Sequence, residues 1–216
     1  MHRKKLLETV FITSAFLFAF AFISGLYILQ YPQWWKWLVY EQVPLTWLES
    51  SLLLACSFFS FICFIFCYKE NKKDKVFWFL LTGSFLLFAF DERFAVHERF
   101  RDKIIAPADI RIPFITWTSP GDYILLFVMA AGLIMFFRLI RLFRYRKMTY
   151  VFFITAVSLS AAAVIMDSFD MTGYPVFYQR TEQFIEEIIE TSAMLFFMNT
   201  FFLCSIDHIY ENFKSN

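Results

Sequence analysis

Long runs of apolar residues, separated by short polar stretches, are the dominant pattern of this chain. Six such segments can be marked, at residues 9–30, 47–68, 76–99, 121–140, 149–170 and 182–206. A helix of about 20 apolar residues, rising about 1.5 Å per residue, crosses the hydrocarbon core of a bilayer. The pattern therefore predicts an all-α, polytopic membrane protein in which residues 1–216 form a single domain of six transmembrane helices.

The composition agrees with this fold class. Hydrophobic residues make up 59% of the 216 positions and aromatic residues 22%, with 32 Phe, which is more apolar surface than a soluble domain of this size can bury. The first segment follows "MHRKK" but continues to Gln30, beyond the apolar region of a signal peptide, so we expect an uncleaved helix. The aromatic stretch "YPQWWKWLVYEQVP" after it predicts a short interfacial helix or loop.

The distribution of charge predicts the orientation. With the N-terminus inside, the inner segments hold 13 of the 20 Lys and Arg residues and only five of the 19 acids. Basic residues near helix ends favour the cytoplasmic side of a membrane. We therefore expect both termini in the cytoplasm, and the remaining acids at the outer face.

Several of those acids lie within the predicted helices. Asp91 is about 24 Å along a helix from Lys75, and Glu190 is about 25 Å from Asp207. In a hydrocarbon core of roughly 30 Å, both lie just below the outer surface. Four helices contribute ionisable side chains near this level, and the full set of candidates is Asp91, Glu92, His97, Glu98, Glu186, Glu187, Glu190, Glu49 and Asp167.

Two motifs contain most of these residues. In "DERFAVHERF", Asp91 and Glu98 are seven residues apart and would nearly share a face of a continuous helix. In "EEIIETSAM", Glu190 precedes an uninterrupted apolar span. Ionisable groups inside membrane segments usually mark function. The alternatives are a salt-bridge network with arginines such as Arg93, Arg99, Arg101, Arg111 and Arg180 for the first motif, and a helix cap for Glu49.

A carboxylate-rich set with one imidazole suits iron or manganese, with zinc or calcium as further options. The template of di-metal helical bundles, which needs Glu-x-x-His pairs, fits incompletely. The chain has no H-E-x-x-H motif, nucleophile elbow or glycine-rich phosphate loop, and nothing in it supports nucleic-acid binding. The sequence therefore predicts a divalent metal site and identifies no catalytic residue.

The two motifs together resemble those of a loose group of bacterial multi-pass membrane proteins with D-E-x4-H-E and E-E-x2-E motifs. The resemblance implies a location in the bacterial inner membrane and no established activity. The matching residues here are Asp91, Glu92, His97, Glu98, Glu186, Glu187 and Glu190.

Three functions are compatible with the sequence. The first is a membrane protein with a metal site on the extracytoplasmic side. If it is an enzyme, its substrate would be a lipid or another amphiphile from the outer leaflet. The second is a proton- or cation-coupled transporter, although the inner halves of the helices show no continuous polar path. The third is a structural subunit, in which the acids pair with a partner subunit or a second copy.

Overall fold

The computed structural model describes residues 2–40, 42–105, 107–108, 123–169, 171 and 173–215, and these ranges contain helices and no strand. The helical elements are α1 (His2–Leu29), η1 (Trp34–Trp37), α2 (Pro44–Lys69), α3 (Lys75–Phe94), α4 (Val96–Phe100), the π-helix η2 (Arg101–Ile105), α5 (Tyr123–Phe143), α6 (Lys147–Asp167) and α7 (Val176–Ser215). For the described residues, the all-helical prediction is confirmed.

Four helices, α1, α2, α6 and α7, are long and apolar enough to cross a membrane. The third predicted span, α3, carries Asp91, Glu92 and Arg93 near its C-terminal end. The side chains of the fourth, α5, are described only from Phe127 onward. The structure is therefore consistent with a membrane protein, while six spans and two cytoplasmic termini stay predictions.

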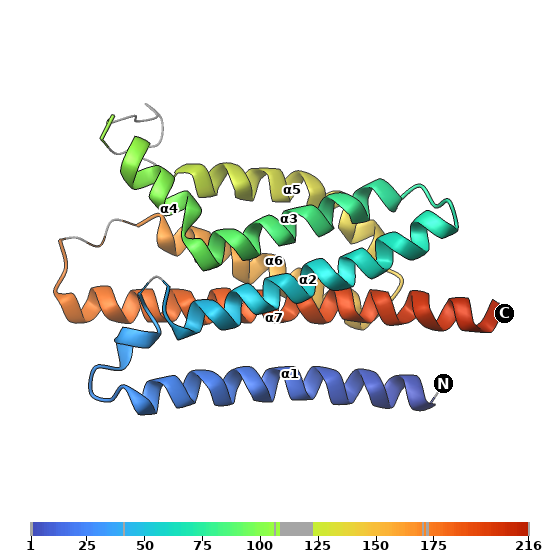
Figure 1. Cartoon of the computed structure of the whole chain (residues 1–216), viewed down its shortest axis with the longest axis horizontal. Helices are drawn as coiled ribbons and strands as arrows, with labels where there is room; N and C mark the ends of the chain where they lie inside the picture. The colour runs from blue at the N-terminus through green and yellow to red at the C-terminus, as the bar shows by residue number, and fades with distance from the viewer. Residues whose placement is uncertain are drawn as a thin grey trace.

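The helices pack around α7, which runs the whole length of the molecule (Figure 1). α2 and α6 pack along α7, α3 packs along α2, and α5 packs on α6. The Ser50 hydroxyl donates a 2.8 Å hydrogen bond to the carbonyl of Ala89, and Ser57 donates one of 2.9 Å to Thr82. Small hydroxyl residues of this kind allow two apolar helices to approach closely. α1 lies apart and makes few contacts with α2 and α7 (Figure 1).

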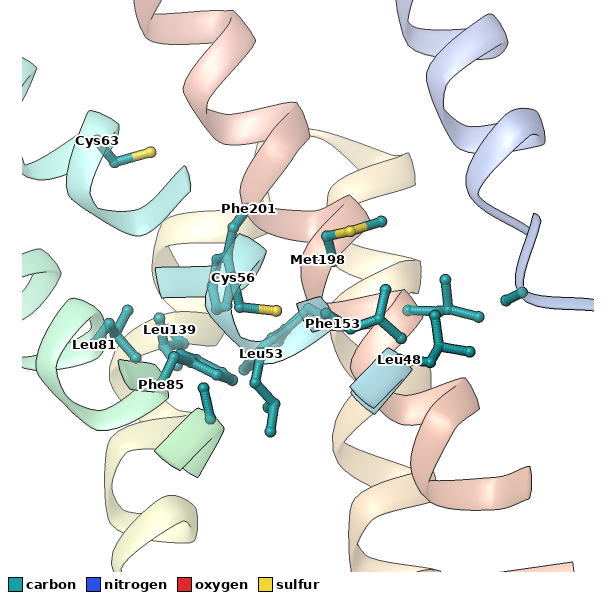
Figure 2. Packing of buried hydrophobic residues seen from close by; sticks show 14 of the residues in the cluster. Leu48, Leu53, Cys56, Cys63, Leu81, Phe85, Leu139, Phe153, Met198 and Phe201 are labelled. Atoms are coloured by element: carbon teal, nitrogen blue, oxygen red, sulfur yellow. The ribbon is translucent and has the colours of Figure 1, made fainter. Parts of the chain in front are cut away.

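Aromatic side chains fill the centre of the bundle. Trp78, Phe153 and Phe201 are fully buried, and the ring of Phe201 lies 5.1 Å from that of Phe85 in an edge-to-face contact. Figure 2 shows side chains of α2, α3, α5, α6 and α7 in this part of the core, among them Cys56, Leu139 and Phe201. Edge-to-face packing stabilises such pairs by about 1 kcal/mol beyond the burial of their surface. The core thus holds α2, α3, α6 and α7 in fixed register.

Several helices differ from their predicted bounds, most clearly α3 and α7. α3 ends at Phe94 rather than near Arg99, because Ala95 adopts a left-handed conformation with φ 47° and ψ 50°. α7 extends from Val176 to Ser215, well beyond the predicted range 182–206. The apolar pattern marks only the part of a helix that suits a hydrocarbon layer, whereas polar residues can continue the same helix on both sides.

Candidate functional site

Glu49 is the most deeply buried acid of the predicted set. It lies in the second turn of α2, and its side chain is 0% exposed. Its Oε1 accepts a 2.6 Å hydrogen bond from the hydroxyl of Thr191 on α7. Its Oε2 has no hydrogen-bond partner among the described residues. The N-cap of α2 is Val43, so the alternative that Glu49 caps this helix is wrong.

Three further carboxylates act electrostatically on Glu49. Glu187, Glu92 and Glu190 lie close enough for their charges to act on it, and they come from α7, α3 and α7 respectively. Glu187 and Glu190 share a face of α7 because they are three residues apart. We call Glu49, Glu92, Glu187 and Glu190 the four-glutamate cluster. Each of the other three members has interactions of its own besides those with Glu49, as Glu186 does.

Asp91 and His97 form a separate unit at the end of α3. The Asp91 Oδ1 atom accepts the backbone N–H of His97 at 2.8 Å, and Oδ2 lies 2.7 Å from the His97 Nδ1 atom. This geometry depends on the break at Ala95, which turns the chain so that His97 comes back to Asp91. Because α3 ends there, helical phase does not relate Asp91 to Glu98. The first motif is therefore split between two local structures.

His97 lies in α4, beyond the end of α3. Burial disfavours the charged ring, but the hydrogen bond and the negative charge of Asp91 outweigh this effect and raise the pKa of His97 above its usual value. Asp91 thus holds both the backbone and the ring of His97, as expected of a residue that fixes a helix start.

The remaining predicted residues gather near α4. Glu98 lies 3.7 Å from Arg101, and Asp167 at the end of α6 acts electrostatically on Glu98 and on Glu182. Among the described residues, no three His, Cys, Asp or Glu side chains are placed so as to hold a metal ion. The predicted layer thus consists of the four-glutamate cluster, the Asp91–His97 pair and the group around Glu98, rather than one preformed shell.

The arginines of the expected salt-bridge network have two kinds of partner, acids and aromatic rings. Arg101 contacts Glu98 and Asp102, as that alternative predicted. Arg93 lies 4.1 Å from the ring of Trp47, and Arg180 lies 4.6 Å from the ring of Tyr40, in cation–π contacts. The sequence did not indicate these aromatic partners. Arg111, another expected partner in this network, lies outside the described residues.

A second charged region lies at the other end of the bundle. Arg146, which precedes α6, donates a 2.6 Å hydrogen bond to Glu8 of α1 and one of 2.7 Å to Asp207 of α7. Lys4 also pairs with Asp207. We call these four residues the Arg146 network. The sequence placed the basic residues of this network at the cytoplasmic side and did not indicate their partners, although the acid Glu8 directly before the first apolar segment was a signal that a base lies nearby.

Within the described part of the chain, these observations define an all-helical protein with four candidate membrane spans and a buried glutamate on which other carboxylates act. The chain belongs to a family described as Domain of unknown function (DUF8692), whose family model matches residues 10–205. No curated protein and no solved structure matches the chain.

Proposed function

We propose that the chain is a bacterial inner-membrane protein with six transmembrane helices and cytoplasmic termini, and that its four-glutamate cluster binds a divalent cation on the extracytoplasmic side. The apolar runs and the distribution of basic residues support this topology. One observation carries the cation site: Glu49 is completely buried, one of its oxygens has no hydrogen-bond partner among the described residues, and the charges of three other glutamates act on it.

Burying a carboxylate without a compensating charge is costly, and carboxylates placed together repel one another. The carboxylate of Glu49 is the member of the cluster that a proton or a bound cation would stabilise directly, because the charges that act on it are negative. A divalent cation would neutralise two carboxylates at once and use the free oxygen of Glu49 as a ligand. In the described conformation the side chains are not arranged around a common point, so cation binding requires rotation of glutamate side chains toward Glu49.

The chemistry of the donors narrows the choice of ion. All four members of the cluster offer oxygen, and hard oxygen donors suit manganese, calcium and magnesium better than zinc. His97 belongs to the separate Asp91–His97 pair, so the four-glutamate cluster itself contains no imidazole that would favour iron or zinc. Manganese is therefore the ion we favour. A metal-bound water next to an amphiphile from the outer leaflet would then be the reactive group of an enzyme.

Metal content tests this proposal. The protein would be purified in detergent, reconstituted with manganese, freed of loose metal and measured by elemental analysis. We expect bound manganese in the wild type and its loss in Glu49→Gln, while Glu211→Gln, at an exposed position of α7, the helix that carries Glu187 and Glu190, behaves as the wild type. Wild-type protein that retains no divalent metal would overturn the proposal.

A second candidate, a proton or cation pathway, is favoured by a different observation. Ser60, Thr149 and Asn199 are buried, and each has a side-chain oxygen without a hydrogen-bond partner among the described residues. Buried polar atoms of this kind are commonly satisfied by internal water. A proton or cation flux in proteoliposomes that disappears in Glu190→Gln would favour this pathway over a static cation site.

A further inference from the structure

An apolar groove of about 610 Å³ lies between α1 and α7. It is lined by residues of α1 from Phe16 to Ile28 and by residues of α7 from Phe184 to Leu195. The α1 side therefore extends over about 18 Å. One side is open, since Phe20 and Ile28 in its lining are 72% and 71% exposed. The groove has the volume of a ligand pocket and the length of an acyl chain.

The groove and the four-glutamate cluster share a residue, Thr191. Thr191 lines its floor and donates the hydrogen bond that holds Glu49 on the other side. Ser24 of α1 and Ser192 of α7 are further hydroxyl residues in an otherwise apolar lining. Both helices are candidate spans, so the groove faces the hydrocarbon layer that would surround them. In that layer, acyl chains are the available occupants.

Aromatic rings and basic residues lie near the end of the groove that Tyr27 and Phe184 form, next to η1. Trp34 of η1 lies 5.9 Å from the ring of Tyr27 and 5.1 Å from that of Phe184, and both of these rings line the groove. Lys36, two residues after Trp34, is exposed, and Arg180 lies one helical turn before Phe184. Aromatic residues favour the headgroup level of a membrane, and basic side chains there attract phosphate.

We propose that the groove between α1 and α7 binds one acyl chain of an anionic phospholipid, with the phosphate near Lys36 and Arg180. The inference rests on the proposed function in one respect, the assignment of this end to the outer leaflet. It names the class of amphiphile that the cation site would meet, because Glu187 and Glu190 lie on the same stretch of α7 as the groove lining.

Photolabelling tests the occupant. The protein would be placed in phosphatidylcholine nanodiscs containing phosphatidylglycerol with a photoreactive group in mid-chain, irradiated, and its labelled peptides mapped by mass spectrometry. We expect labels to concentrate on the groove lining of α1 and α7, and to be sparse at Phe18, which is exposed on α1 outside this lining. Equal labelling of Phe18 and the lining would overturn the proposal, and so would cross-links that join two copies through this groove.

Filling the groove should remove the lipid. Ser24→Trp is expected to lower the labelling of the lining about tenfold, equivalent to about 1.4 kcal/mol of binding free energy. Ser192→Trp fills the same groove from α7 and decides the question if Ser24→Trp does not fold. The matched control is Ser51→Trp, in a separate groove between α2 and α3, which should leave labelling unchanged. Wild-type labelling in a folded Ser24→Trp or Ser192→Trp variant would contradict the inference.

Two further variants separate the lipid from the cation. Lys36→Ala combined with Arg180→Ala should abolish the preference for phosphatidylglycerol over phosphatidylcholine, and an unchanged preference would contradict the headgroup assignment. Glu49→Gln should retain groove labelling, since Thr191 can still donate to the amide oxygen. If the wild type is labelled in the groove but retains no manganese after reconstitution, the lipid groove is supported and the cation site is contradicted.

Discussion

Glu8 and Glu49 are both carboxylates that the bundle buries almost completely, at 6% and 0% exposed, yet their surroundings are opposite. Glu8 belongs to the Arg146 network, in which two acids meet a guanidinium and an ammonium group. Three other glutamates act electrostatically on Glu49, and its own hydrogen bond comes from a neutral hydroxyl. Glu8 is thus balanced by basic side chains. The charges that act on Glu49 are negative.

The difference indicates what each region does. The Arg146 network joins the beginnings of α1 and α6 to the last third of α7, and so it fixes helices that are distant in sequence. The four-glutamate cluster also involves three helices, α2, α3 and α7, but the charges of the other glutamates repel the Glu49 carboxylate. A buried acid that meets a base is therefore structural, whereas Glu49, on which other acids act, is a candidate ligand.

The largest expected effect comes from breaking the balanced region. Arg146→Ala would leave Glu8 and Asp207 without their shared partner, and we expect a loss of about 2 kcal/mol in the free energy of unfolding, less than for a fully buried pair. Thermal unfolding in detergent measures it. Arg144→Ala is the matched control, because Arg144 is exposed and bonds only to Tyr145 among the described residues. Equal unfolding temperatures in the two variants would contradict a structural role for the network.

Replacing each of the two acids with glutamine should change the stability of the metal-free protein in different directions. Glu8→Gln weakens an ion pair, so we expect it to lower the stability of the metal-free protein by about 1 kcal/mol. Glu49→Gln removes a charge that its neighbours repel, so we expect it to leave metal-free stability unchanged or raised. The same unfolding measurement compares them. A loss in Glu49→Gln as large as that in Glu8→Gln would mean that the two regions do not differ as proposed.

At the Asp91–His97 pair, we expect a smaller loss of stability than that of Arg146→Ala. His97→Ala should cost about 1 kcal/mol and increase hydrogen exchange in α4. Because the pKa of His97 is raised in the folded protein, its charged pair with Asp91 contributes fully below the unfolded pKa of about 6.5. This contribution is lost as the pH rises through the higher folded pKa. The stability difference between wild type and His97→Ala should shrink over that range, and a pH-independent difference would argue against a charged pair.

The smallest effect is expected where charges are exposed. Glu70 and Lys72 pair at 2.6 Å in the turn after α2, but both are open to solvent. Lys72→Ala should leave the unfolding temperature unchanged, because exposed ion pairs contribute little. A clear drop would show that short ion-pair distances, rather than burial and balance, decide which charges matter.

Part of this account could be predicted from the sequence. The apolar runs identify the helices, and estimates of depth bring Glu49, Glu92, Glu187 and Glu190 to one level because helix rise is constant. The break at Ala95 could not be predicted, since alanine is a good helix former and nothing near it favours a left-handed residue. The break is stabilised by the hydrogen bond from the backbone N–H of His97 to Asp91. This contact forms only once the chain has turned at Ala95, so the sequence pattern does not indicate it.

Contacts between distant helices were also beyond the sequence. Thr191 lies 142 residues from Glu49, and Arg146 lies 138 residues from Glu8, so no local pattern relates them. Burial of Glu49 depends on which face of α2 meets α7, and α2 is apolar on nearly all sides. The sequence could indicate that acids were misplaced in apolar helices, but not which of them would meet a base.

The central claim is that the four-glutamate cluster, and not the Arg146 network, binds a divalent cation. Thermal unfolding of wild type, Glu49→Gln and Glu211→Gln, each titrated with manganese, tests it most directly. At a concentration 100 times Kd, binding to the folded state stabilises it by about 2.7 kcal/mol. We predict this stabilisation in wild type and Glu211→Gln and its absence in Glu49→Gln. The same manganese response in all three proteins, or none in the wild type, would contradict the claim.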